Sequence, residues 1–309
     1  MTDPSGAVDA APRSRARGRR LRRDLTGWAF VAPAALVILG LSIFPTIWAG
    51  WLSTQKTDFI VPGKNVGLEN YQRMLDDPRV WQAVKTTLLF TLMYVPLAVG
   101  LGLAIAIALN QKIRLNGFYR TGIFIPYVAS AAATGILATF VFNREYGVAN
   151  DLLAAIGISE QPFFQDPSQA LILLVIVFLW GSIGLNVVIY LAALQDIPRD
   201  VIEAARVDGA YRWGTFRHVI VPALVPVTIF QVVWSLITAF QFFDLIVTTT
   251  NGQPAGKTNS IVFLLYEIAF RKTHRYGYGA AIAVSLAVVS LALAAVLFVR
   301  GRRTGEAMA

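Results

Sequence analysis

Residues 167–195 read PSQALILLVIVFLWGSIGLNVVIYLAALQ and contain no Lys, Arg, Asp or Glu. The run is longer than the roughly 20 residues that a helix needs to cross about 30 Å of hydrocarbon. Its apolar residues do not alternate with polar ones, so it lacks the period-2 pattern of a membrane-barrel strand. Helices and closed barrels alone satisfy their backbone hydrogen bonds inside a bilayer. The run therefore predicts a membrane-spanning helix.

Five further runs without a charged residue lie on either side of this one, at 25–55, 86–111, 121–143, 218–243 and 276–299. The whole chain of 309 residues is 56% hydrophobic and only 15% charged. Its mean hydropathy is +0.58, which is too apolar for an ordinary soluble domain. These observations predict an all-α polytopic membrane protein with six transmembrane helices.

The basic residues fix the expected orientation. With the N-terminus inside, 17 of the 27 Lys and Arg residues fall on the cytoplasmic side, as the positive-inside rule requires. We therefore expect both termini in the cytoplasm and the chain in a bacterial inner (plasma) membrane, surrounded by lipid. Most of the net charge of +9 comes from an arginine cluster beside the first run, so we expect no nucleic-acid partner. That cluster comprises Arg13, Arg15, Arg17, Arg19, Arg20, Arg22 and Arg23.

Three segments outside the runs are long enough for short helices. Residues 56–85 and 144–169 are predicted to hold surface helices on the outer side, where a soluble partner could bind. Residues 257–275 read as an amphipathic element, with apolar residues at helical spacing but too few of them to span a membrane.

Several kinds of chemistry are not supported by the sequence. There is no cysteine, and the two histidines, His218 and His274, lie far apart, so we expect no metal site. Residues 252–258 look like a phosphate-binding loop, but only three residues separate the glycines where the motif needs four. We therefore expect no ATP binding and no enzymatic activity in this chain.

The long polar segment between the fourth and fifth runs reads DIPRDVIEAARVDGAYRWGTFRHVIVPALVP at 196–226. Pro198 and Asp200 favour a helix start, and Gly209 allows a turn that other residues resist. We expect a second short helix from Tyr211 to His218, with Pro222 at the start of the next span. Such an exposed hairpin on the cytoplasmic surface is suited to docking another subunit.

This segment resembles the signature loop of the membrane subunits of bacterial binding-protein-dependent ABC importers. That signature is E-A-A, three residues, G, nine residues and I-x-L-P; here Val219 and Val221 replace its Ile and Leu. EAA alone occurs by chance in many helices, but the spacing is specific. The resemblance implies a type I importer permease fold and a role in coupling to the ATPase. The coupling residues it implies are Glu203, Ala204, Ala205, Asp208, Gly209 and Pro222.

Other stretches are similar to carbohydrate-type permeases for maltose, glycerol 3-phosphate and oligosaccharides: GLENY at 67–71, RTGIFIPY at 120–127, LAALQDIP at 191–198, DGA at 208–210 and FFDLIVTTTNGQPAG at 242–256. The resemblance implies a sister permease, a cytoplasmic ATPase dimer that holds ATP and Mg²⁺, and an extracytoplasmic sugar-binding protein. No cofactor is implied in this chain.

The resemblance also completes the expected domain organisation. A cytoplasmic Arg-rich tail occupies 1–26, the first transmembrane helix and an outer loop occupy 27–80, and a cytoplasmic tail occupies 300–309. The transmembrane type-1 permease domain is expected at 81–299, with its coupling loop at 196–222.

Polar residues inside spans mark a candidate transport pathway. In related permeases the sugar lies against the fourth and fifth spans, and Ser235, Thr238 and Phe242 match site positions on the fifth. Hydrogen bonding between helices is the alternative role for such residues. The carried compound stays open among a neutral sugar, a small oligosaccharide, glycerol phosphate and another polyol. The predicted pathway residues are Trp180, Ser182, Asn186, Gln231, Ser235, Thr238 and Phe242.

Two rival classes were weighed against this prediction. An ion-driven secondary carrier should show ionisable residues within its spans and inverted repeats. A membrane-embedded enzyme should show a nucleophile with a base, or a metal-ligand cluster. The six charge-free runs and the two scattered histidines favour neither.

Overall fold

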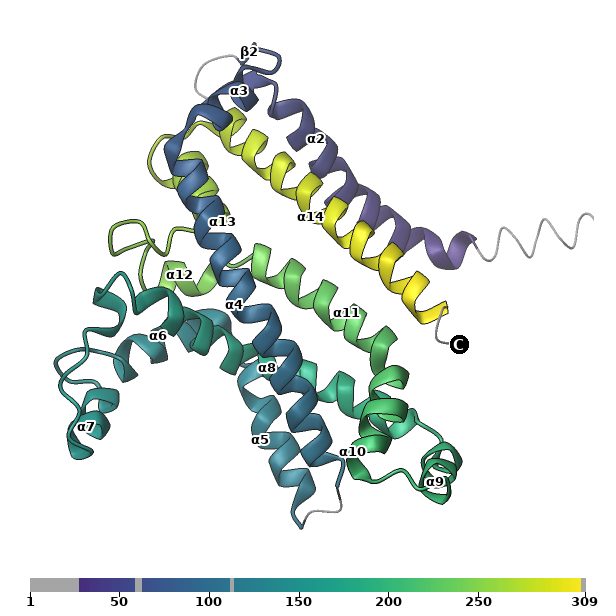
Figure 1. Cartoon of the computed structure of the whole chain (residues 1–309). Helices are drawn as coiled ribbons and strands as arrows, with labels where there is room; N and C mark the ends of the chain where they lie inside the picture. Colours follow the sequence, from purple (N-terminus) through teal and green to yellow (C-terminus); the bar gives the residue numbers. More distant parts are fainter. Residues whose placement is uncertain (1–27, 59–62, 112–113, 307–309) are drawn as a thin grey trace, which may run out of the picture. The chain divides into compact units, whose positions relative to one another are not determined.

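The computed structural model describes residues 28–58, 63–111 and 114–306 (Figure 1), in two units that divide between Trp51 and Leu52. The predicted cytoplasmic tail at 1–26 lies outside the described residues. The first unit is one long helix that begins at Trp28 and includes a π-helical turn, η1 (Leu39–Ile43), before α2 (Phe44–Leu52). Its large apolar side chains are exposed on all sides. A helix that is apolar all round belongs in lipid or among other membrane helices.

The second unit contains four long apolar helices. A helix over Arg212–Phe240 combines α10 (Arg212–Thr215), the π-helical turn η3 (Phe216–Ile220) and α11 (Val221–Phe240). α4 packs most extensively on α8, and α11 packs on α4, α8 and α14. Among the described residues, five helices are thus long and apolar enough to cross a membrane. The other three long helices are α4 (Pro78–Leu109), α8 (Ala170–Asp196) and α14 (Tyr276–Glu306).

The run at 121–143 is not the single straight span that the sequence predicts. It forms α5 (Asn116–Val128) and α6 (Ala131–Val141), which meet at a bend of 99°. Pro126 removes a backbone N–H from the last turn of α5, and Ala129 and Ser130 then adopt extended conformations. With the bent pair counted as one span, the described residues hold six candidate spans, as expected from the sequence.

Short elements join the outer ends of these helices. β1 (Gln55–Lys56) pairs antiparallel with β2 (Lys64–Asn65), and α3 (Glu69–Asp76) follows in the first outer segment. The second outer segment holds α7 (Val148–Ala155) and the 3₁₀ turn η2 (Phe163–Gln165). After α11 come α12 (Asp244–Thr248), α13 (Ile261–Tyr266) and the π-helical turn η4 (Glu267–Arg271). Ile261, Leu264 and Ile268 are buried against α4 and α14, so this amphipathic element is part of the core.

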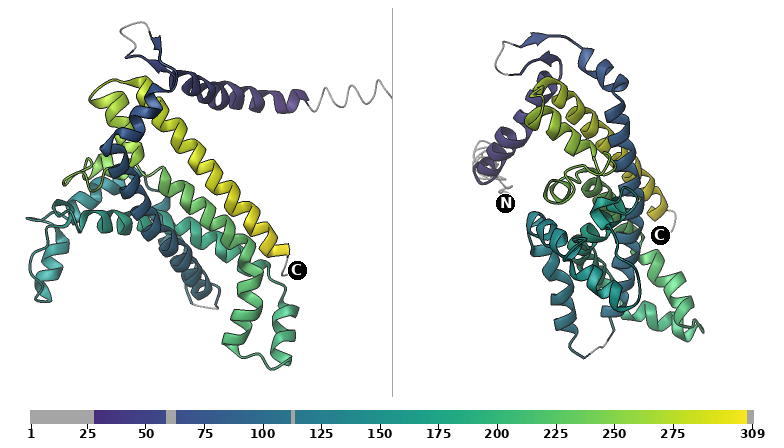
Figure 2. Two further views of the ribbon diagram at one scale, coloured as in Figure 1. Left: turned by 45° about the horizontal axis from the view of Figure 1, so that its top comes forward. Right: turned by 90° about the vertical axis from the view of Figure 1, so that its left-hand side faces the viewer.

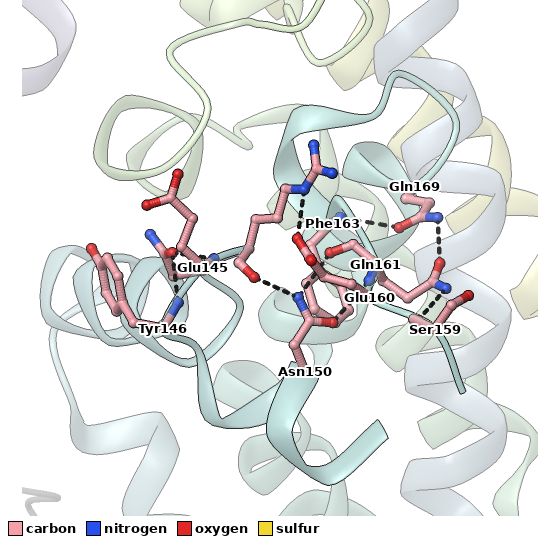
Figure 3. A network of polar contacts seen from close by, with 10 residues as sticks. Glu145, Tyr146, Asn150, Ser159, Glu160, Gln161, Phe163 and Gln169 are labelled. Carbon is pink, nitrogen blue, oxygen red and sulfur yellow. Dashed lines mark hydrogen bonds and ion pairs between the residues drawn. The ribbon is translucent and has the colours of Figure 1, made fainter. Parts of the chain in front are cut away.

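Buried amides hold the outer segments in place. The Asn70 side chain donates hydrogen bonds to the carbonyl oxygens of Ser53 and Gln55, at 2.8 and 2.9 Å. Figure 3 shows a similar network in the second segment. There the Asn150 side chain donates to the carbonyl oxygens of Arg144 and Gln161 and accepts from the Gln161 N–H. These loops are therefore ordered without disulfides.

The start of α4 is fixed by Asp77, which caps the helix and accepts a hydrogen bond from the Arg79 N–H at 3.0 Å. The Arg79 side chain also donates to this carboxylate and lowers the pKa of Asp77 to about 2. Because the folded pKa lies below the usual 3.8, the resulting stabilisation is complete above that value. It is lost as the pH falls towards 2.

The close packing of α5 on α8 leads to a stability prediction. A Cβ at Gly184 would lie 2.7 Å from the Ile123 carbonyl oxygen and 3.0 Å from the Phe124 Cα, both backbone atoms. Gly184→Ala should therefore force the two helices apart and cost about 1–3 kcal/mol. Thermal unfolding of the purified protein measures this cost as a lower Tm.

Gly181→Ala is the matched control on the same helix. Its Cβ would meet nothing closer than the Thr134 Cγ2 at 3.9 Å. A helical alanine is more favourable than a glycine by about 1 kcal/mol, so the Tm of this variant should stay the same or rise. Equal Tm values for the two variants would contradict the packing argument.

Candidate functional site

The predicted hairpin begins with α9 (Arg199–Val207), directly after Pro198. Gly209 ends the helix with a left-handed φ of 84°. The Gly209 N–H donates to the Arg206 carbonyl at 3.1 Å, and the Ala210 N–H donates to the Ala205 carbonyl at 2.9 Å. These two bonds are the pair that defines a Schellman helix end. No atom lies within 4 Å of a Cβ built on Gly209, so backbone conformation rather than space favours glycine here.

The hairpin presents a mixed surface to its surroundings. Glu203, Ala204 and Asp208 are exposed and Ala205 is partly buried. Three large apolar residues beside them were not among the predicted coupling residues. Val207, Tyr211 and Trp213 are 87%, 88% and 69% exposed. Apolar residues flanking the E-A-A segment were visible in the sequence, but their exposure depends on the turn at Gly209. Such a surface is typical of a protein-docking site.

The second arm of the hairpin is continuous with the membrane helix. The sequence predicts a separate helix from Tyr211 to His218 and a new span starting near Pro222, but the structure has unbroken helical backbone over Arg212–Phe240. Figure 2 shows this helix changing direction between the hairpin arm and α11. The Val221 N–H bonds to the Phe216 carbonyl, five residues back. This π-helical turn lies just before Pro222 and helps the helix to continue through a residue without an N–H donor. A displacement of the hairpin would therefore act directly on α11.

Four of the predicted pathway residues come together between α4, α8 and α11. Asn186 is 2% exposed, and Gln231 and Ser235 are fully buried. The Gln231 amide donates to the Asn186 carbonyl oxygen at 2.9 Å. Tyr94 donates to the Ser182 hydroxyl at 3.0 Å, and Ser182 donates in turn to a backbone carbonyl. We call these five residues the polar node.

The polar node has unused hydrogen-bonding capacity. Within the described chain, no partner is present for the Asn186 Oδ1, the Gln231 Oε1 or the Ser235 Oγ. Buried polar atoms without a partner cost roughly 1–3 kcal/mol each. The node therefore joins the three helices but leaves two acceptors and one hydroxyl available to a small polar group.

The other three predicted pathway residues lie elsewhere. Phe242 is 1% exposed and stacks on Phe90, with ring centroids 3.9 Å apart; it belongs to the aromatic core at the outer end of α11. Trp180 is 47% exposed on α8. Thr238 is half-buried, and its hydroxyl donates to the Trp234 carbonyl at 2.9 Å. The structure thus separates the predicted set into the polar node, a core aromatic residue and two accessible side chains.

Comparison with known proteins connects the hairpin and the fold to a family. Residues 98–304 match the family described as binding-protein-dependent transport system inner membrane component. The chain is 35% identical to a lactose transport system permease protein of Rhizobium radiobacter, over 90% of this chain and 95% of the relative. It is 31% identical to a trehalose/maltose transport system permease protein of Thermococcus litoralis, over 92% and 96%.

A solved structure has the same fold at low sequence identity. A chain of a bacterial alginate ABC transporter, in complex with an alginate pentasaccharide-bound periplasmic protein, superposes with a TM-score of 0.82 at 21% identity. The match covers 93% of this chain and 98% of that chain. It supports the type I importer permease fold.

The helix end at Gly209 leads to a prediction about the hairpin. Gly209→Asn should be tolerated and Gly209→Val should not, because asparagine adopts the left-handed conformation far more readily than a β-branched residue. We expect ATP-driven uptake by the assembled complex to follow the order Gly, Asn, Val, with the ATPase lost from the purified Val variant. Gly214→Ala is the control, since its Cβ would make an ordinary 3.6 Å contact with the Ala210 Cβ. The same uptake for Asn and Val would refute the conformational role.

The unpartnered hydroxyl of Ser235 leads to a second prediction. The Ser235 hydroxyl lies beside the Tyr94 hydroxyl but makes no well-formed hydrogen bond in the described chain, so Ser235→Ala should change the Tm little. If Ser235 contacts the transported compound, uptake should fall about three- to tenfold at unchanged Tm, as the loss of one hydrogen bond would cause. Unchanged uptake would leave Ser235 with only a packing role. Measuring both quantities on one preparation separates the two roles.

Proposed function

The chain belongs to the binding-protein-dependent transport system inner membrane components, and we propose that it forms half of the translocation pathway of an ATP-driven sugar importer. It is a sugar permease subunit of an ABC transporter and a multi-pass inner-membrane protein. ATP hydrolysis takes place on a separate partner protein, which would hold ATP and Mg²⁺. This chain is a transport subunit rather than an enzyme.

The observation that carries the proposal is the continuity of the hairpin with α11. An exposed hairpin with Val207, Tyr211 and Trp213 around Glu203 offers the ATPase both apolar area and a charge. Because helical backbone runs unbroken from its second arm into α11, motion of the ATPase would pass to the polar node through helix rather than through a loop. We therefore assign the coupling role to the hairpin, with Glu203 as its polar contact and Gly209 as its turn.

A second permease completes the proposed complex. One chain supplies one hairpin, while an ATPase dimer presents two equivalent docking surfaces. Many large apolar side chains of this chain remain exposed along its spanning helices. A sister permease would cover part of this surface and contribute the other half of the pathway.

The outer elements are the proposed contact with a sugar-binding protein. α3 and α7 lie in ordered segments outside the spans, and with the expected topology they face away from the ATPase. The solved alginate transporter contains a periplasmic protein bound to its sugar. Both termini would then lie in the cytoplasm, in agreement with the distribution of Lys and Arg.

The transported compound is proposed to be a neutral sugar or small oligosaccharide. Curated relatives are permeases for lactose, for trehalose/maltose and for sn-glycerol 3-phosphate. The six apolar runs of this chain contain no Lys, Arg, Asp or Glu. An anion would therefore meet no counter-charge from this subunit at membrane depth. The amides and hydroxyls of the predicted pathway residues suit sugar hydroxyl groups.

Charge reversal at Glu203 tests the coupling role. We expect Glu203→Lys to reduce ATP-dependent sugar uptake at least tenfold in proteoliposomes that contain the two permeases, the ATPase and the binding protein. The reason is that one buried charge-assisted contact is worth roughly 1.5–3 kcal/mol. Co-purification of the ATPase shows whether docking itself is lost.

Glu145→Lys provides the matched control, because it makes the same charge change at an exposed residue of the second outer segment. It should leave ATPase co-purification unchanged. Normal uptake and normal ATPase binding by Glu203→Lys would mean that the hairpin is only a connection between two spans, and the proposed coupling route would be wrong.

A further inference from the structure

The tryptophans of this chain show an uneven distribution in depth. Five of the seven lie within eight residues of a charged residue, near the ends of the apolar runs or in the hairpin. This is the usual position for tryptophan, whose amphipathic ring prefers the membrane interface. Trp180 and Trp234 are the exceptions, at 14 and 10 residues from the nearest charged residue. At 1.5 Å per residue, Trp180 lies about 15 Å along α8 from its start at Ala170, and Trp234 lies about 9 Å along α11 from its end at Phe240.

Both of these tryptophans are accessible rather than buried. Trp180 is 47% exposed and Trp234 is 43% exposed. In the described part of the chain, the indole N–H of Trp81 has an acceptor, the Leu75 carbonyl, whereas those of Trp180 and Trp234 have none. An indole N–H that faced hydrocarbon at this depth would stay unpaired, which is costly. A polar group from outside the chain would remove this cost at both positions.

Contacts between α8 and α11 place the two tryptophans at a similar depth. The Gln231 amide bonds to the Asn186 carbonyl, and the Tyr190 hydroxyl bonds to Thr228. The two helices therefore run antiparallel. One turn further along α11, Trp234 lies level with the residues of α8 that are about one turn from Trp180.

The face of α11 that carries Trp234 differs from the face that carries the polar node. Gln231 and Ser235 point between the helices, whereas Phe230 and Trp234 lie about 100° around the axis and are 51% and 43% exposed. Their rings stack, with centroids 6.3 Å apart and planes at 19°. Thr238 continues this face by one more turn, with its hydroxyl tied back to the Trp234 carbonyl.

We propose that the stacked pair Phe230–Trp234 is a sugar-binding platform at the middle of the transport pathway. This inference rests on the proposed sugar transport and names residues for it. An aromatic face covers the apolar face of a pyranose, and the indole N–H donates to a sugar hydroxyl. Helix interfaces in membranes are enriched in small residues that allow close approach, which argues against a sister helix on this bulky pair. The absence of charged residues in the run suits a neutral sugar.

Two substitutions at Trp234 separate sugar binding from packing or lipid contact. Leucine keeps the apolar bulk without a ring, and phenylalanine keeps a ring without the N–H. We expect Trp234→Leu to lower the maximal uptake of lactose, trehalose or maltose about five- to tenfold at saturating binding protein. Trp234→Phe should retain at least a third of it. Phe298→Leu, an exposed ring in α14, is the control and should transport normally.

Each other outcome of this experiment overturns the platform. If Trp234→Leu transports as well as the wild type, Trp234 faces lipid. If the sister permease no longer co-purifies with this variant, Trp234 lies in a subunit interface. Equal losses in the Leu and Phe variants with an intact complex would exclude stacking. If the wild-type complex transports none of the three sugars while ATPase docking still depends on Glu203, the sugar assignment fails and the platform with it, but the coupling role stands.

A labelling measurement covers the case in which Trp234→Leu does not assemble. The chain has no cysteine, so Trp234→Cys carries a single thiol, which reacts as thiolate only where water reaches it. A membrane-impermeant maleimide should modify it in the assembled complex. Addition of sugar-loaded binding protein with ATP should slow the reaction at least threefold. A thiol that never reacts, or whose rate ignores the sugar, would contradict the proposal.

Discussion

Hydrocarbon supplies no hydrogen-bond partner to a peptide group, so the backbone of this chain must satisfy itself wherever it crosses the membrane. Five long helices do so within themselves. The bent pair α5 and α6 interrupts this pattern, because Ala129 and Ser130 are extended and exposed at the bend. The Ala129 N–H still bonds to the Pro126 carbonyl, and the Ser130 carbonyl accepts from the Thr134 N–H. Irregular backbone at membrane depth is tolerated where protein or water covers it, which agrees with a permease that works in a complex.

The same constraint bears on how the proposed coupling hairpin could act on the spanning helices. A flexible connection between hairpin and span would absorb the motion of a docked partner. Here the helical backbone runs unbroken through the π-helical turn over Phe216–Ile220 and past Pro222, so no loop separates the hairpin from α11. The Schellman end at Gly209 forms the turn between the two arms. Both features suit the coupling role proposed for the hairpin.

The sequence predicts much of this because its signals are local. The six charge-free runs locate the spans, and the spacing from Glu203 to Pro222 locates the hairpin. Which side of each helix packs against which neighbour could not be predicted from the sequence. Helical periodicity shows that Gln231, Ser235 and Phe242 share one side of α11, but only packing shows that this side meets α4 and α8. The bend after Val128 was missed for a related reason: its residues are as apolar as those of a straight span, and Pro126 is compatible with either geometry.

The polar node links three helices but also contains buried polar atoms without hydrogen-bond partners. Its hydrogen bonds join α8 to α4 and α11, yet three of its buried polar atoms have no partner in the described chain. Each such atom raises the free energy of this helix packing by roughly 1–3 kcal/mol relative to a state in which water or a ligand reaches it. An apolar interface of the same size would carry no such penalty and would be harder to open. A transporter must exchange between arrangements that differ by only a few kcal/mol, and unpaired amides between three helices keep that difference small while the aromatic core around Phe90 holds their outer ends together.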